Sequence, residues 1–318
     1  MTEPHKRANR HPKYKTAYRV KNWREYDKSL RDRGDITLWI SQDAIDAWTP
    51  PQTGKRGYSD AAIETALSLR LLFRLPLRQT EGFLSSILSL MDVTLPCPDH
   101  TTLSRRTTTL AIRCQIDRAP EGPLSLIVDS SGLKVCGQGE WHRQKHGEKS
   151  HKRWKKLHIG VEAQGRIVAS TVTASQEQDP SQVPALLSQV HHRIDRFVGD
   201  DIFDQAPVYT AVENHSPEAR VIIPPRKDAV LSPTATTAPS QRDQHLLAIE
   251  SEGRCAWKRI SGYYAQSHAE NTFSRFKRTF GGGLRAKRDA SQEREASLAC
   301  QLLNRVRELG RPESSPVR

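Results

Sequence analysis

Three acidic residues stand out in a chain whose formal net charge is +13: Asp129, Asp200 and Glu270. The two aspartates each follow a short apolar run typical of a strand, and Glu270 lies in a helical stretch rich in bases and aromatics. Carboxylates are ligands that Mg²⁺ prefers, and two metal ions about 3.5–4 Å apart can cut a phosphodiester in line. The residues therefore predict metal-dependent chemistry on a phosphate backbone.

The composition favours a polyanionic partner. The 318 residues include 49 Lys and Arg against 36 Asp and Glu, and neutralising phosphates releases counterions. Nucleic acid is the first expectation; an anionic membrane surface or a simply solvated basic enzyme are the alternatives. No apolar run approaches the roughly 20 residues that span a bilayer, and residues 1–21 lack the apolar core of a secretory signal. We expect a cytoplasmic protein without membrane insertion.

The cysteines give no sign of a metal or disulfide framework. They are scattered and form no C-x-x-C pair, so we expect free thiols. They are Cys97, Cys114, Cys136, Cys255 and Cys300.

The N-terminal part predicts three helices. Residues 61–75 are apolar-rich, with a capping candidate among residues 57–60 and Pro76 behind. A second helix starts near Arg78, and a third spans residues 101–112 behind an N-cap at Asp99. Two helices, a short break and a third helix resemble a helix-turn-helix.

The polar face of the third helix has side chains of the kinds that contact phosphates and base edges in a major groove. The alternative is a three-helix bundle whose polar face is merely solvated. The residues expected to be exposed are Thr101, Thr102, Ser104, Arg105, Arg106 and Thr107.

After residue 123 short apolar runs separated by turns predict an α/β layer. Strands are expected at residues 124–129, 157–162, 166–173, 195–200 and 219–224, with a hairpin turn at residues 163–166. Residues 180–193 read as a helix, residues 225–261 as a mixed connection with a flexible loop at 232–240, and a final helix carries Glu270. This order matches a ribonuclease H-like domain.

In such a domain the central first strand, the neighbouring fourth strand and the last helix meet. Asp129, Asp200 and Glu270 stand at those three points. Asp201 and Asp204 compete with Asp200, but strand alternation allows only one of the adjacent pair to face the site. A single aspartate at a strand end is more commonly a cap or turn residue, so the prediction depends on the set.

The last helix has a core stripe and a charged face. Phe273, Phe276 and Phe280 fall on one side, while Glu270 and Lys277 are seven residues apart and nearly in register. Lys277 could therefore approach a phosphate at the metals. A solvated charge pair is the alternative.

A basic segment precedes the second strand. Lys152, Arg153, Lys155 and Lys156 suit a DNA backbone track, and Trp154 could stack on a base or simply pack in the core.

Several motifs together resemble bacterial insertion-sequence transposases with an Asp-Asp-Glu triad, of the insertion-sequence-5 family. The resemblance extends from about Asn22 to Arg307. It includes N-W-R-E-Y at 22–26, L-P-L-R-Q-T-E-G at 75–82, P-D-H-T-T at 98–102, V-D-S-S-G-L-K-V at 128–135, G-E-W at 139–141, W-K-K-L-H at 154–158 and I-P-P-R-K at 223–227.

The resemblance implies a division of labour among the site residues. The D-G-x-[YF]-D motif maps to residues 200–204 and selects Asp200, with Asp201 in place of the glycine. In the Y-x-x-R-x-x-x-E-x-x-x-x-x-x-K signature, Tyr263, Glu270 and Lys277 match. Gln266 replaces the arginine, whose cation could hold a phosphate.

By this resemblance, Asp129, Asp200 and Glu270 hold two Mg²⁺ ions, for which Mn²⁺ can substitute. Tyr263 and Lys277 position double-stranded DNA, both terminal inverted repeats and target. Synapsis of two ends implies at least a homodimer, in a nucleoid-associated bacterial protein.

We therefore expect a retroviral-integrase-like, ribonuclease H-like catalytic domain at residues 121–310, preceded by an all-α helix-turn-helix-like DNA-binding domain at 22–120. Residues 1–21 and 311–318 are expected to be tails. The expected reaction is metal-dependent DNA cleavage followed by strand transfer. A ribonuclease H-like nuclease without strand transfer and a non-catalytic DNA-binding protein derived from a transposase are the two alternatives.

Overall fold

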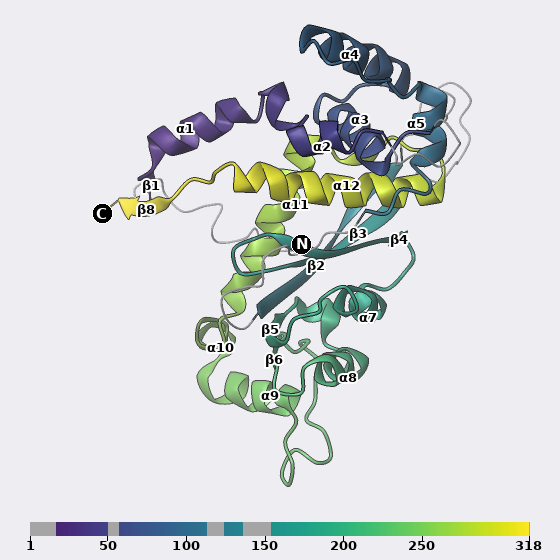
Figure 1. Ribbon diagram of the computed structural model, residues 1–318. Helices are drawn as coiled ribbons and strands as arrows, with labels where there is room; N and C mark the ends of the chain where they lie inside the picture. The colour runs from purple at the N-terminus through teal and green to yellow at the C-terminus, as the bar shows by residue number, and fades with distance from the viewer. Residues whose placement is uncertain (1–16, 50–56, 113–123, 136–153, 318) are drawn as a thin grey trace, which may run out of the picture. The chain divides into compact units, whose positions relative to one another are not determined.

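The computed structural model describes residues 17–49, 57–112, 124–135 and 154–317 (Figure 1). The chain divides into two units, one of residues 42–304 and one of residues 1–41 with 305–318. The boundary that the sequence places near residue 120 lies outside the described residues. None of the described helices is long and apolar enough to cross a bilayer.

The smaller unit joins the two ends of the chain. Its elements are strand β1 (Ala17–Val20), helix α1 (Trp23–Asp32), the 3-10 helix η2 (Ile36–Leu38) and strand β8 (Ser314–Val317). Strands β1 and β8 pair antiparallel, with Tyr18 opposite Pro316.

The expected terminal tails therefore contain paired strands. The Asn22 side chain connects them, since its Nδ2 donates to the Arg311 carbonyl at 2.9 Å and its Oδ1 accepts from the Glu313 N–H at 2.7 Å. Contacts between segments almost 300 residues apart leave no local pattern in the sequence.

The larger unit begins with helices α2 (Gln42–Asp46), α3 (Asp60–Leu72), α4 (Leu77–Leu90) and α5 (His100–Arg106). The predicted caps are confirmed: Ser59 Oγ accepts from the Ala62 N–H at 3.1 Å, and Asp99 accepts from the N–H groups of Thr101 and Thr102. Such bonds satisfy N–H groups that have no partner in the first helical turn.

Helix α5 is shorter than predicted, since it ends at Arg106 rather than near residue 112. Thr107, Thr108 and Thr109 follow, and each hydroxyl donates to a carbonyl three or four residues earlier. Hydroxyl bonds of this kind compete with continuation of a helix.

A mixed sheet follows. Its strands are β2 (Leu124–Val135), β3 (Trp154–Val161), β4 (Ile167–Ala174), β5 (Ile194–Val198), β6 (Arg220–Ile222) and β7 (Gly283–Leu284). The order is β4-β3-β2-β5-β6, with β7 beside the far end of β2. Strands β3 and β4 are antiparallel to their neighbours, whereas β5 and β6 run parallel to β2. The predicted ribonuclease H-like fold is confirmed.

The helices of this half are α7 (Val183–Leu187), α8 (Ala206–His215), α9 (Gln241–Glu252), α10 (Arg254–Ile260), α11 (Ser267–Phe280) and α12 (Asp289–Glu308). The 3-10 helices η3 (Asp179–Gln182), η4 (Asp201–Phe203) and η5 (Tyr263–Gln266) connect them.

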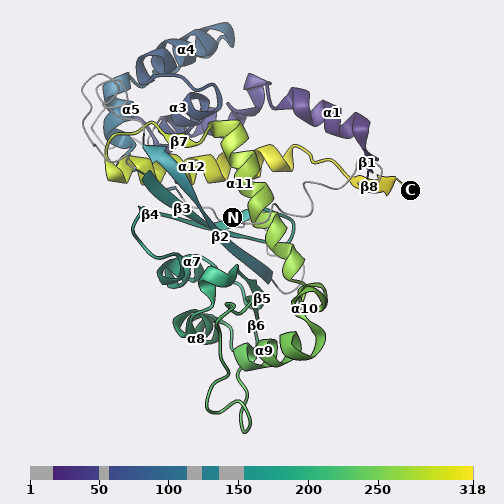
Figure 2. The same cartoon turned by 180° about the vertical axis from the view of Figure 1, so that it is seen from behind.

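Helices α7 and α8 lie against one face of the sheet, and α11 runs along the other (Figures 1 and 2). Leu124, Leu126 and Val128 alternate along β2 and pack in one buried cluster with residues of α7 and α8. Strand periodicity turns Ile127 and Asp129 to the α11 side.

Three predicted elements differ from the structure. Strand β2 continues to Val135 instead of ending at Asp129, because β3 pairs with it as far as Lys134 opposite Trp154. The helix predicted at 180–193 is replaced by η3 and the short α7. The connection 225–261 contains α9 and α10, which meet at Gly253 with φ of 85°.

Candidate active site

Strand register brings the first two acids to the same level. Ile127 of β2 lies opposite Val198 of the parallel strand β5. Two residues further along each chain come Asp129 and Asp200. Beyond Val198 the backbone turns, and Asp200 Oδ1 accepts the Ile202 N–H at 3.1 Å as the N-cap of η4.

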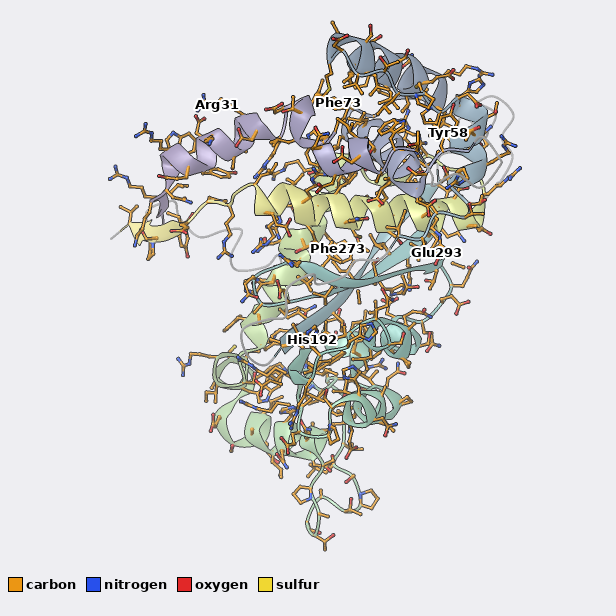
Figure 3. All side chains as sticks on the ribbon, in the orientation of Figure 1. Arg31, Tyr58, Phe73, His192, Phe273 and Glu293 are labelled. Atoms are coloured by element: carbon orange, nitrogen blue, oxygen red, sulfur yellow. The ribbon has the colours of Figure 1, made fainter. Side chains whose placement is uncertain are left out.

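The helix that carries Glu270 is fixed beside these strands. Phe273 and Phe276 are buried on its inner side, and Figure 3 labels Phe273 on α11. At its start, the Nε2 of buried Gln266 donates to the Val128 carbonyl, next to Asp129, at 3.1 Å. This bond ties the helix to β2 one residue before the first acid.

Gln266 thus has a different environment from the one expected of a phosphate-binding position. Its side chain is only 5% exposed and bonds to the backbone of β2. Because the Gln266 side chain is buried, it is not available to a DNA phosphate at the surface. Its bond to β2 holds the start of α11 instead.

Electrostatics shows that the three acids share one region. The pKa of Asp129 is raised to about 6, chiefly by burial and also by the charges of Asp200, Glu270 and Asp179. Burial also raises the pKa of Asp200, with repulsion from Asp201 and Asp179. Grouped carboxylates whose pKa values are raised by burial and by neighbouring charges are characteristic of functional sites.

Tyr263 lies within the same group. Burial raises the pKa of its hydroxyl to about 12, with contributions from Asp200, Asp201, Glu270 and Asp129. The Lys258 ammonium lies 4.9 Å from the centre of its ring. The phenol therefore remains protonated at neutral pH and can donate a hydrogen bond.

The neighbours of Asp200 have other positions. The Asp204 side chain is fully buried and pairs with the Arg242 guanidinium at 2.8 and 3.1 Å. It also accepts the Arg226 N–H at 3.1 Å. Asp201 is exposed. Asp204 is therefore occupied by structural contacts, which leaves Asp200 as the acid beside Asp129.

The donor set is suited to a hard divalent cation. Asp129, Asp200 and Glu270 offer only oxygen atoms, and no described Lys or Arg forms an ion pair with any of them. Within the described ranges, no three His, Cys, Asp or Glu side chains lie close enough to hold one metal ion together. The acids are grouped around one place, but their carboxylates do not converge on one point.

The residues expected to bind DNA have varied surroundings. Thr101 and Thr102 bond through their hydroxyls to Asp99, and Arg106 bonds to Asp60 and to the Tyr58 carbonyl. Arg105 is exposed. Thr107 is buried, at 8% exposure, so its predicted exposure is wrong: its hydroxyl donates to the Leu103 carbonyl.

The basic segment before β3 is only partly described. Lys152 and Arg153 lie outside the described residues. Lys155 pairs with Asp289 at 3.1 Å, and Lys156 pairs with Asp179 at 2.7 Å. Lys277, by contrast, is exposed on α11.

Two neighbours of the site were missed in the sequence. Ser130 donates its backbone N–H to Asp129 Oδ1 at 2.7 Å and its hydroxyl to Asp179 Oδ2 at 2.8 Å. Asp179 stands before a proline at the start of a predicted helix, where an aspartate is ordinary. Only the folded sheet shows that it reaches β2.

Comparison with known families agrees with this geometry. Two family models match, and both are described as a transposase DDE domain, the first over residues 31–138 and the second over residues 120–305. The second match contains Asp129, Asp200 and Glu270 together with the whole ribonuclease H-like sheet. Because it spans more than half of the chain, this protein belongs to the family of transposase DDE domains, which are catalytic domains of transposases.

Proposed function

We propose that this protein is an insertion-sequence transposase of the insertion-sequence-5 type. It binds the terminal inverted repeats of its own element, cuts the DNA at the element ends and joins the freed 3′-hydroxyl to target DNA. The observation that carries this proposal is the grouping of three acids on β2, the end of β5 and α11, without a cationic partner among the described residues.

Asp129, Asp200 and Glu270 are the residues that would hold two Mg²⁺ or Mn²⁺ ions. Such ions supply an activated oxygen nucleophile and stabilisation of the leaving oxygen. The protein contributes position: Gln266 fixes the start of α11, and the buried face of α11 leaves Glu270 and Lys277 exposed.

Tyr263 and Lys277 act on the DNA. The Tyr263 hydroxyl, with its pKa raised to about 12 by burial and the nearby acids, donates a hydrogen bond to a phosphate oxygen. Lys277 lies two turns after Glu270 and offers an ammonium to the same backbone.

We assign recognition of the element ends to helices α3 to α5. A surface hollow lies between the start of α4 and α5, lined by Arg78, Gln79, Thr101, Ser104 and Arg105, among others. Two guanidinium groups and several hydroxyl and amide groups match the chemistry of phosphate and base-edge contacts. The formal net charge of +13 favours the same partner. At least two copies would hold two DNA ends.

The test is a strand-transfer assay with the full chain, Mg²⁺, a donor DNA carrying the native element ends and a supercoiled target. Glu270→Ala should abolish cleavage and joining while preserving binding to the ends, because Glu270 is exposed and its loss should leave the fold intact. Glu252→Ala, which removes an exposed acid from the end of α9, is the matched control and should remain active.

Each contrary outcome identifies a different protein. Ends that are cut but never joined would indicate a nuclease. Specific binding without cleavage, unchanged by Glu270→Ala or by chelation of Mg²⁺, would indicate a DNA-binding protein derived from a transposase.

A further inference from the structure

A polar network lies behind the strand that carries Asp129. At its centre is Asp179, which is 8% exposed. Its Oδ1 accepts from Lys156 Nζ at 2.7 Å, and its Oδ2 accepts from Ser130 Oγ at 2.8 Å. His158, 1% exposed, places its Nδ1 3.9 Å from Asp179 Oδ1.

This network occupies the face of the sheet opposite to the Asp129 side chain. Ser130 lies directly across from His158, and Lys156 lies across from Gly132, so their side chains share one face. Asp129 precedes Ser130 in the same strand and points to the other face, toward α11. Asp179 approaches from η3, on the side covered by α7.

Ser130 is the link between the two faces. Its backbone N–H donates to Asp129 Oδ1 at 2.7 Å, while its hydroxyl donates to Asp179 Oδ2. The first bond orients the Asp129 carboxylate. The second bond holds the same residue from behind, so a rotation of the backbone at Ser130 would break both.

The network also lies within electrostatic reach of the site. The charge of Asp179 is one cause of the raised pKa of both Asp129 and Asp200, after burial of each group. If Asp179 only held Lys156 in place, one of its two carboxylate oxygens would be enough. The other oxygen, Oδ2, accepts from Ser130, which follows Asp129 in β2.

We propose that Asp179 is a positioning residue of the active site, which fixes Ser130 so that Ser130 holds the Asp129 carboxylate in its metal-binding orientation. The proposal rests on the proposed function, since it assumes that Asp129 is a metal ligand. Partners of this kind behind a metal ligand usually contribute about 10–100-fold to metal affinity or activity.

The test compares four variants of the full chain: Asp179→Ala, which removes both carboxylate oxygens, Ser130→Ala, the double variant of these two, and Ser130→Thr, which keeps the hydroxyl. Asp243→Ala is the control for loss of a buried, hydrogen-bonded acid, since Asp243 holds Ser232 and Ser240 at the start of α9. Mn²⁺ binding is measured by calorimetry without DNA, alongside thermal unfolding and single-turnover cleavage of the element ends.

We expect Asp179→Ala and Ser130→Ala each to weaken Mn²⁺ binding about tenfold and to slow cleavage about 10–100-fold. The double variant should lose no more than either single one, because both remove the same bond. Ser130→Thr and Asp243→Ala should bind Mn²⁺ normally, and Asp179→Ala should lower the melting temperature no more than Asp243→Ala.

Unchanged Mn²⁺ binding in Asp179→Ala would overturn the proposal, as would losses in the two single variants that add in the double one. If the unaltered protein binds Mn²⁺ through Asp129 but cuts no DNA, the proposed function fails while the Mn²⁺ affinities still decide the role of Asp179. If Asp129→Asn leaves Mn²⁺ binding unchanged, both fail.

Discussion

We predict that the ionised Asp129 carboxylate lowers the free energy of unfolding of the metal-free protein. Burial and neighbouring carboxylates raise its pKa from 3.8 to about 6. At about 1.36 kcal/mol for each unit, a shift of roughly two units corresponds to about 3 kcal/mol. Because the folded-state pKa is raised, the ionised group destabilises the fold: this cost is absent below pH 3.8 and is fully present above pH 6.

Replacing Asp129 by Asn removes the charge and keeps an oxygen to accept the Ser130 N–H. We therefore expect Asp129→Asn, in EDTA at pH 7.5, to have a free energy of unfolding up to about 3 kcal/mol higher than that of the unaltered protein. At pH 4 the difference should nearly vanish. The same substitution should abolish DNA cleavage.

Urea denaturation at both pH values, followed by circular dichroism, measures this difference. Glu270→Gln is the control, since Glu270 is exposed and its substitution should leave stability nearly unchanged. An Asp129→Asn variant that is less stable than the unaltered protein at pH 7.5 would refute the reasoning, because it would mean that Asp129 supports the fold. Addition of Mg²⁺ should narrow the gap by stabilising only the unaltered protein.

Two further predictions concern neighbouring groups. Asp204→Ala should lower the free energy of unfolding by about 3 kcal/mol, because it leaves the partly buried Arg242 without its partner. Urea denaturation measures this loss, and an unchanged free energy of unfolding would show that the pair does not stabilise the fold. His158 is buried, and burial lowers its pKa from 6.5 to about 4, so its contribution to stability is complete above pH 6.5 and is lost as the pH falls toward 4. Between pH 6.5 and pH 4, His158→Gln should therefore lose about 3 kcal/mol less stability than the unaltered protein. If the free energies of unfolding of the two proteins fall in parallel over this range, His158 is not the group responsible.

Much of the catalytic half could be predicted from local patterns. The five predicted strands correspond to β2 to β6, although their ends differ. Inside the predicted helix 180–193, the apolar residues Val183, Leu186, Leu187 and Val190 are all buried. The order of strands and helices along the chain then predicts the fold, because the rules for connecting strands leave few possible sheet topologies. The three acids followed from their places at those elements, and their assignment as metal ligands stays a prediction.

What the sequence did not predict depends on contacts between distant segments. The continuation of β2 past Asp129 depends on β3, and the pairing of β1 with β8 joins the two chain ends. In the sequence, Gln266 replaces an arginine that could hold a phosphate. In the structure, the Gln266 side chain is buried and bonds to the Val128 carbonyl. Burial of one polar side chain cannot be deduced from the spacing of a motif.

The two faces of β2 divide the work of the site. Asp129 faces α11, where Glu270 is found, while Ser130 faces the core side, where Asp179 is found. Because successive strand residues alternate, one strand can present a ligand on one face and its support on the other. Carboxylates that repel one another stay grouped only where the backbone that carries them is held in place, since movement apart would relieve the repulsion. The bonds of Gln266 to Val128 and of Ser130 to Asp179 hold the strand at the residues before and after Asp129, so the proposed support for this site comes from both of its neighbours in β2.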